Sequence, residues 1–131
     1  MAELKPGITG IEETVVEPPI TADGVGNPGA FVLSTTHLAV MFELAALKSV
    51  LPHLDPGQGT VGTRLEIKHL AATPLGLRVR AQATLEEVDG RRLVFHLEAH
   101  DDREKIAEGV NERFVVDMKR FLDRADQKKS G

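Results

Sequence analysis

The chain has 131 residues, enough for one domain with a single hydrophobic core and too few for two independent cores. Hydrophobic residues make up 41% of it and charged residues 27%, which is typical of a globular protein and excludes disorder throughout. Its 20 acidic residues outnumber 16 basic ones, so a nucleic-acid partner is not expected.

Cysteine is absent, which excludes disulfides, thiolate metal sites and cysteine nucleophiles. The first 20 residues lack the apolar segment of a signal peptide, and no apolar run reaches the roughly 20 residues that span a bilayer. We therefore expect a single domain over residues 1–131 in the cytoplasm, without a membrane partner.

The N-terminal part predicts a strand followed by a loop. Residues 9–16 have strand character, and Pro18 and Pro19, which cannot donate to a strand ladder, end it. Residues 21–34 are rich in glycine and are predicted to form a loop. Within them, residues 24–29 match G-x-G-x-x-G, but a dinucleotide site needs this motif between a strand and a helix of a βαβ unit, whereas here two prolines precede it and the later strands look antiparallel.

The longest apolar segment runs from Thr36 to Leu51, with Glu43 and Lys48 as its only charged residues. It is long enough for a helix and too apolar all round for a surface helix, so we predict a buried central helix. The Ser34-Thr35-Thr36 run offers candidates for its N-cap, and Pro52 follows its end.

The second half predicts antiparallel strands. Apolar and polar residues alternate with period two, which places one set on a core face and the other in solvent. The predicted strands are residues 61–71, 77–85, 93–100 and 106–116, with a two-residue hairpin turn at Asp89-Gly90. After Asp117, the apolar residues Met118, Phe121 and Leu122 have helical spacing, and residues 124–131 are expected to fray.

These elements predict an α+β fold in which a sheet of about five strands buries its apolar face on the helix. A small isolated sheet has edge strands that are commonly paired with another chain, so we expect dimerisation through an edge strand.

Glu43 is the first candidate site residue. A carboxylate in the middle of an apolar helix is costly to bury in its charged form unless it reaches water or finds a partner. General bases and nucleophiles occupy such settings. From the residues alone, a catalytic role and a structural ion pair with Lys48 or an arginine both remain open.

Three further residues each have a functional and a structural interpretation. His69 lies near the end of a predicted strand, where a lone histidine is more often structural than catalytic. Thr35 fits an N-cap. Gly62 fits either a turn or, within a strand, a bulge or a close approach to the backbone. The histidines show no spacing that brings metal ligands to one face, and we predict no metal site.

A more specific motif runs from His69 to Leu77, with the pattern H-x-A-A-T-P-x-G-L. It is accompanied by Val61-Gly62-Thr63 and by residues 88–93, 99–101 and 109–113. Together these segments resemble the hotdog-fold thioesterases related to fluoroacetyl-CoA thioesterase. The resemblance extends without an evident gap from about Thr35 to Arg113.

This resemblance implies a hotdog fold, with an antiparallel sheet wrapped around a central helix, in a homodimer or higher homo-oligomer with active sites between subunits. It also implies hydrolysis of a small acyl-CoA thioester by a threonine, a glutamate and a histidine, which fall on Thr35, Glu43 and His69. The substrate-binding glycine and arginine fall on Gly62 and Arg113. Coenzyme A is then part of the substrate, and no cofactor is expected.

Two positions depart from the family. Gly26 and Gly29 stand where the fluoroacetyl-specific enzyme has lid phenylalanines, with Phe31 displaced, and Asn111 replaces a histidine. We therefore expect residues 21–34 to form the lid loop and thioesterase chemistry to occur without fluoroacetyl selectivity. Two alternatives stay open: an acyl-thioester hydratase or dehydratase, and a non-catalytic acyl-CoA binding module.

Overall fold

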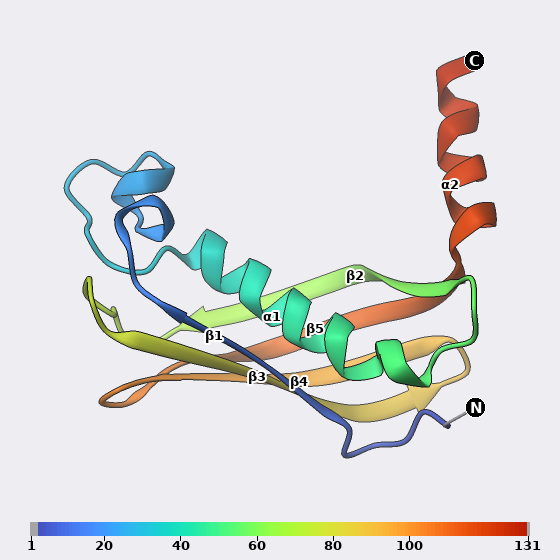
Figure 1. Ribbon diagram of the computed structural model, residues 1–131, viewed down its shortest axis with the longest axis horizontal. Coiled ribbons are helices and arrows are strands. Elements are labelled where there is room, and N and C mark those ends of the chain that lie inside the picture. Colours follow the sequence, from blue (N-terminus) through green and yellow to red (C-terminus); the bar gives the residue numbers. More distant parts are fainter. Residues whose placement is uncertain (1–2, 131) are drawn as a thin grey trace.

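The computed structural model describes residues 3–130 and contains one long helix, one short helix and five strands (Figure 1). In chain order these elements are β1 (Thr9–Val15), α1 (Thr35–Val50), β2 (Gln58–His69), β3 (Arg78–Asp89), β4 (Arg92–Asp101), β5 (Lys105–Asp117) and α2 (Met118–Asp126). Short 3₁₀ helices lie at Pro18–Ile20, Asp23–Val25, Leu51–His53 and Gln127–Ser130. Residues 1, 2 and 131 lie outside the described residues. They are the two ends of the predicted domain, and residue 131 is also the end of the tail that is expected to fray.

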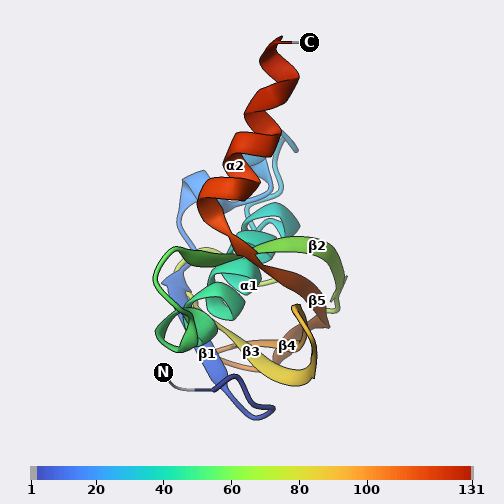
Figure 2. The same cartoon turned by 90° about the vertical axis from the view of Figure 1, so that its right-hand side faces the viewer.

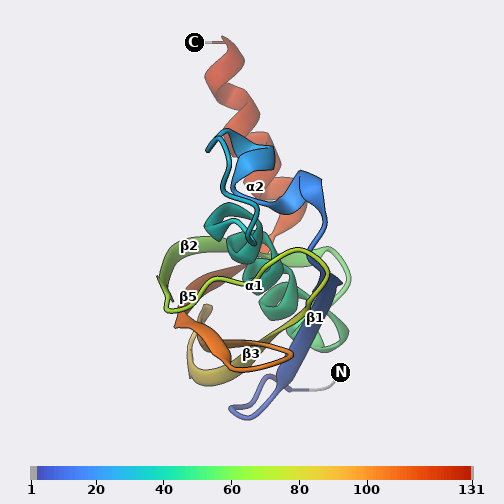
Figure 3. The ribbon, with the colours of Figure 1, turned by 90° about the vertical axis from the view of Figure 1, so that its left-hand side faces the viewer.

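The five strands form one antiparallel sheet in the order β1-β3-β4-β5-β2. The sheet curls strongly, so that it wraps around α1 when the molecule is viewed along the helix (Figures 2 and 3). Strands β1 and β2 are the two edges. The predicted α+β class, with about five antiparallel strands around a central helix, is confirmed.

The core lies between α1 and the concave face of the sheet. Alternate residues of the central strands β3 and β4 are buried, as the period-two pattern predicts. They pack against one side of α1 in a single apolar cluster. Its largest members include Leu38, Phe42, Leu85, Phe95 and Leu97.

Helix α1 is capped by Ser34, whose side chain accepts a hydrogen bond from His37 N over 3.0 Å. The sheet covers only part of the helix surface. Val40 and Leu44 are therefore exposed in the single chain, although the apolar sequence predicts a helix buried on all sides. These two residues, one turn apart, form an exposed apolar stripe on α1, which ends at the exposed Lys48.

The hairpin between β3 and β4 turns at Gly90-Arg91, one residue later than predicted, because Asp89 and Arg92 are already a cross-strand pair. Gly90 has φ +60°, and no non-glycine residue of the described chain has a positive φ. These angles fit a type II′ turn, which needs glycine at its first central position only.

The 21–34 loop is held by hydrogen bonds at both ends. Ala22 N donates to Val32 O, and Leu33 N donates to Thr73 O, each over 2.8 Å. The loop and α2 rise from the same side of the molecule, at opposite ends of β2 (Figure 1). Within residues 3–130, the helices are too short or too polar to cross a membrane.

Candidate active site

Glu43 extends from the middle of α1 to Arg113 of β5. Arg113 Nη1 donates a hydrogen bond to Glu43 Oε2 over 3.0 Å. The arginine side chain is only 6% exposed, whereas the glutamate side chain is 43% exposed. The carboxylate is thus held by a buried cation and still remains accessible to a substrate.

Arg113 is also fixed by the neighbouring strand. Its Nε donates to Thr60 Oγ1 over 2.9 Å, and its Nη2 donates to the Thr60 carbonyl over 3.1 Å. Asn111 Oδ1 accepts from Nη1 over 3.4 Å, while Asn111 Nδ2 donates to the Arg64 carbonyl over 2.9 Å. Burial lowers the pKa of Arg113, and the adjacent Glu43 acts in the opposite direction. The guanidinium stays charged at neutral pH and is locked in one orientation.

Gly62 lies opposite Arg113 in the β2–β5 register, beside a β-bulge between Gly62 and Arg64. A Cβ atom at position 62 would overlap Glu43 Oε2 and would lie 3.2 Å from Arg113 Nη1. The absence of a side chain therefore leaves the space in which the ion pair meets the strand backbone. The structure thus shows both the bulge and the close approach at Gly62, and not a turn.

Thr35 and His69 form a second cluster near the N-terminal end of α1. Thr35 Oγ1 and His69 Nδ1 are 2.8 Å apart. Because Ser34 caps the helix, the Thr35 hydroxyl is available to the imidazole. His69 Nε2 is buried and has no hydrogen-bond partner within residues 3–130. Burial lowers the pKa of His69, so its imidazole is neutral at neutral pH.

A cavity of about 380 Å³ opens beside this second cluster. The 21–34 loop forms one wall and the segment after β2 forms another. The lining residues other than Thr35 and His69 include Ala22, Asn27, Ala30, Val32, Leu70 and Ala72. Small apolar side chains with a few polar groups at one end suit a small acyl group.

The H-x-A-A-T-P-x-G-L motif connects this cavity to the sheet. Thr73 is fully buried, and its hydroxyl donates to Asp101 Oδ2 over 2.8 Å. Its carbonyl accepts from Leu33 of the loop, and Pro74 forms a β-bridge with Val32. The threonine of the motif is therefore structural, and it fixes the loop next to His69.

The two clusters do not meet within one chain. Thr35 and Glu43 are eight residues apart in α1, which is about 12 Å along a helix. His69 and Gly62 are seven residues apart in β2, which is roughly 20 Å along a strand. The structure places Glu43 with Gly62 and Arg113, and it places Thr35 with His69.

Thr60 was missed by sequence reasoning, and Asn111 was noted only as a departure from the family pattern. Both lie two residues from a predicted site residue on the same strand, Thr60 beside Gly62 and Asn111 beside Arg113. Residues two apart on a strand share a face. Applied to the strand faces that carry Gly62 and Arg113, this rule could have identified Thr60 and Asn111 as candidate site residues.

The sequence and the fold have counterparts in known proteins. Residues 16–119 match the family described as fluoroacetyl-CoA-specific thioesterase. A fluoroacetyl-CoA thioesterase from Streptantibioticus cattleyicolor is 38% identical over 97 residues, which are 74% of this chain and 70% of that protein.

Two solved structures are similar over almost the whole chain. The crystal structure of a mutant of the fluoroacetyl-CoA-specific thioesterase FlK has a TM-score of 0.89 and 32% identity, covering 98% of this chain and 99% of that one. A thioesterase superfamily member from Thermus thermophilus has a TM-score of 0.91 and 29% identity, covering 99% and 96%. Other structures of FlK mutants hold acetyl-CoA, or fluoroacetate with CoA.

The curled sheet around α1 is therefore the hotdog fold of the thioesterase superfamily. The chain belongs to the fluoroacetyl-CoA-specific thioesterase family. It is a thioester hydrolase that acts on a small acyl-CoA. The resemblance drawn from the sequence motifs is confirmed, and hydrolysis is favoured over the hydratase and binding-module alternatives.

Proposed function

We propose that the active enzyme is a homodimer in which each catalytic site combines Glu43, Gly62 and Arg113 of one protomer with Thr35 and His69 of the partner. The observation that carries this proposal is the separation of the two clusters by about 12 Å along α1. A thioester carbonyl and its attacking oxygen occupy only a few ångströms, so a single protomer does not offer both clusters to one substrate.

The edge strand β2 supports this arrangement. Antiparallel pairing of β2 with its copy about a two-fold axis extends the sheet and protects the edge. Such pairing places the end of one β2, with His69, next to the start of the other, near Gly62. The exposed Val40 and Leu44 of α1 supply an apolar surface for the same interface. Higher homo-oligomers can form from this dimer.

Glu43 provides the reacting carboxylate in this proposal. Its Oε2 is bound to Arg113, whereas its Oε1 makes no hydrogen bond within residues 3–130. In one route that oxygen attacks the thioester carbonyl and releases CoA thiolate, and water then hydrolyses the acyl-enzyme anhydride to the acid and the free Glu43 carboxylate. In the other route it removes a proton from a water that attacks the carbonyl and displaces CoA thiolate, and the proton passes to the thiolate. Both routes end in the free acid and coenzyme A.

His69 and Thr35 of the partner protomer form hydrogen bonds on the side of the substrate opposite Glu43. With the proton on Nε2, neutral His69 accepts the Thr35 hydroxyl at Nδ1 and donates at Nε2 to the carbonyl oxygen or the departing sulfur. We assign part of the oxyanion stabilisation to a backbone N–H beside Gly62, where the missing side chain admits the substrate. We further propose that the enzyme acts in the cytoplasm, as the sequence leads us to expect.

Heterodimer complementation tests the composite site. Glu43→Gln and His69→Ala should each lower kcat for release of CoA thiol by about 10²–10⁴-fold, the usual contribution of proton transfer by a positioned side chain. Unfolding and refolding an equal mixture should yield heterodimers in which one of the two sites has both an intact Glu43 and an intact His69. We expect the mixture to regain about a quarter of wild-type activity, since half of the dimers are mixed and each has one intact site.

Glu13→Gln is the matched control, because Glu13 forms an exposed ion pair with Arg80 far from the site and its loss should leave kcat unchanged. A mixture of the two inactive variants that stays inactive, while wild-type protein refolded alongside is active, would contradict a site shared between protomers. Incorporation of ¹⁸O from solvent water into the Glu43 carboxylate over multiple turnovers distinguishes direct attack from general-base catalysis.

A further inference from the structure

We propose that α2 of each protomer closes the acyl cavity of its partner, with Phe121 and Leu122 as the side chains that contact the cavity. This inference rests on the homodimer proposed above. It adds an element that determines which acyl groups are accepted.

Helix α2 carries its apolar residues on one face. Met118, Phe121, Leu122 and Ala125 follow the i, i+3, i+4, i+7 spacing of such a face. The Met118 methyl group packs on Gly59 of β2, where an added Cβ would lie 2.5 Å from it. Met118, at the start of the apolar face, is therefore directed toward β2, whereas Phe121 borders a hollow of about 210 Å³ that Arg91 and Arg124 also line. Phe121 and Leu122, in the next turn, remain 40% and 50% exposed.

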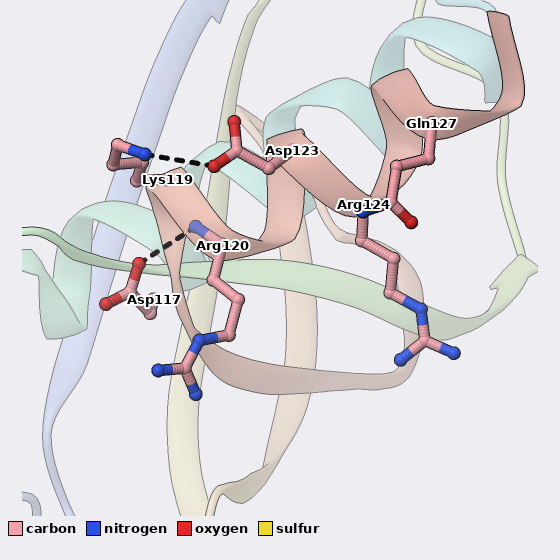
Figure 4. Close-up of a pocket in the computed structure, with 6 residues that line it drawn as sticks. All are labelled: Asp117, Lys119, Arg120, Asp123, Arg124 and Gln127. Atoms are coloured by element: carbon pink, nitrogen blue, oxygen red, sulfur yellow. Dashed lines mark hydrogen bonds and ion pairs between the residues drawn. The ribbon is translucent and has the colours of Figure 1, made fainter. Parts of the chain in front are cut away.

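The polar residues of α2 lie on its other faces (Figure 4). Lys119 pairs with Asp123 over 3.0 Å, and Asp117 caps the helix by accepting a hydrogen bond from Arg120 N over 3.0 Å. The side chains of Arg120 and Arg124 point to the same side of the helix. These residues border an open hollow of about 700 Å³, which belongs to the polar side of α2.

A helix of this kind needs a partner. It has nine residues, none of which is buried in the single chain, and an isolated helix of that length is marginal in water. Figures 1 and 2 show that α2 stands away from the body of the fold rather than lying on the sheet. Packing of its apolar face against another chain would supply the missing stabilisation.

The proposed two-fold axis determines which surface of the partner the apolar face of α2 contacts. The 21–34 loop and α2 lie at opposite ends of β2 and rise from the same side of the molecule (Figure 1). Antiparallel pairing of β2 with its copy exchanges these ends, so α2 comes to lie beside the partner's loop. The surface of the partner beside its loop also exposes apolar side chains: Phe31 is 50% exposed and Leu70 is 55% exposed.

In this dimer Phe121 and Leu122 cover the cavity beside Thr35 and His69 of the partner. They provide bulk that the partner's own loop lacks at Gly26 and Gly29. The helix thereby limits the length of the acyl group and shields the reacting carbonyl from bulk water.

Cysteine cross-linking tests the contact directly, because the natural chain contains no cysteine. The double variant Leu122→Cys/Leu70→Cys should form a covalent dimer under mild oxidation, seen on a non-reducing gel. Leu122→Cys alone is the control and should stay monomeric on the gel, because the two α2 helices lie at opposite ends of the dimer. Absence of the covalent dimer in the double variant would overturn the proposal, as would cross-linking of Leu122→Cys alone.

Acyl-chain profiling tests the role in specificity. Phe121→Ala/Leu122→Ala should lower kcat/KM for short acyl-CoA by about tenfold or more and shift the preferred acyl group toward longer chains. Asp123→Ala, on the polar face of α2, is the matched control and should leave the profile unchanged. An unchanged profile in the double alanine variant would overturn the proposal. Cross-linking is scored without activity, so failure of this contact is distinguishable from failure of the catalytic proposal.

Discussion

In the proposed mechanism, the protonation state of His69 determines how activity responds to acidic pH. Burial disfavours the charged imidazolium, so the pKa of His69 lies below its usual 6.5. The neutral form required by the proposed hydrogen bonds therefore persists at a more acidic pH than in an exposed histidine. We expect kcat/KM to be maintained as the pH falls through 6.5 and to drop only at lower pH.

A pH–rate profile of the wild-type enzyme checks this expectation. The residual activity of His69→Gln serves as the control, because an acid limb due to another group would remain in that variant. The prediction is contradicted if kcat/KM falls on the acid side with a midpoint at or above pH 6.5 and this fall disappears in His69→Gln. The imidazole would then titrate like an exposed one.

At the scale of single residues, the sequence identified the candidates but not their grouping. Glu43 stood out because a charge in an apolar helix demands a partner, and the structure provides Arg113. Thr35 fitted an N-cap equally well, and only the observed cap at Ser34 removes that interpretation. The environment of Arg113 depends on cross-strand register, which no local pattern encodes.

At the scale of elements, two of the three glycines in the β2–β5 pair, Gly62 and Gly109, should respond differently to substitution. A Cβ at Gly62 would meet the flexible Glu43 side chain, whereas a Cβ at Gly109 would overlap the backbone carbonyl of Glu66. We expect Gly62→Ala to lower kcat by about 10²-fold through misplacement of the carboxylate, with little change in Tm. Gly109→Ala should instead destabilise the fold by about 1–3 kcal/mol.

Thermal unfolding and thiol-release kinetics of the two variants, measured side by side, check this contrast. Retention of full kcat in Gly62→Ala would mean that the position of the Glu43 carboxylate beside β2 is not important for catalysis. An unchanged Tm in Gly109→Ala would contradict the close contact between β2 and β5.

The 21–34 loop leads to a prediction on substrate choice. Gly26 and Gly29 add no side-chain bulk over the cavity, and Phe31 is half exposed. Because glycines replace the lid phenylalanines of this loop, we expect kcat/KM for fluoroacetyl-CoA and acetyl-CoA to differ by less than about tenfold. Parallel thiol-release assays with both substrates measure this ratio, and a preference of several orders of magnitude for fluoroacetyl-CoA would contradict it.

Most elements could be predicted because their signals are local. Alternation identified β3 and β4, and the length and apolarity of residues 36–51 identified α1. The hairpin turn was displaced by one residue because Asp89 is used in the ladder, leaving Gly90 to take the positive φ. The exposure of one side of α1 could not be predicted, because it depends on how far the sheet curls.

At the scale of the whole molecule, dimerisation should be required for activity. Val40→Asp introduces a charge into the exposed apolar stripe of α1 and should give a folded monomer with at least 10²-fold lower kcat/KM. Sedimentation and thiol release, measured at the same protein concentrations, test this. Lys48→Gln is the control, because this exposed position of α1 is polar and its side chain pairs with Glu12 of β1, so the change should be less harmful. A fully active Val40→Asp monomer would contradict the prediction.

The strand order β1-β3-β4-β5-β2 also has a consequence for how the chain folds. Strands β3, β4 and β5 are joined by short hairpins, so the entropy of loop closure is small and they can pair early. Strand β2 pairs with β5 across a separation of about 50 residues, with Gly62 opposite Arg113. We therefore expect the bond from Arg113 to Glu43 to form later than the hairpins that join β3, β4 and β5. A newly made chain should acquire most of its secondary structure before its carboxylate is in place to react.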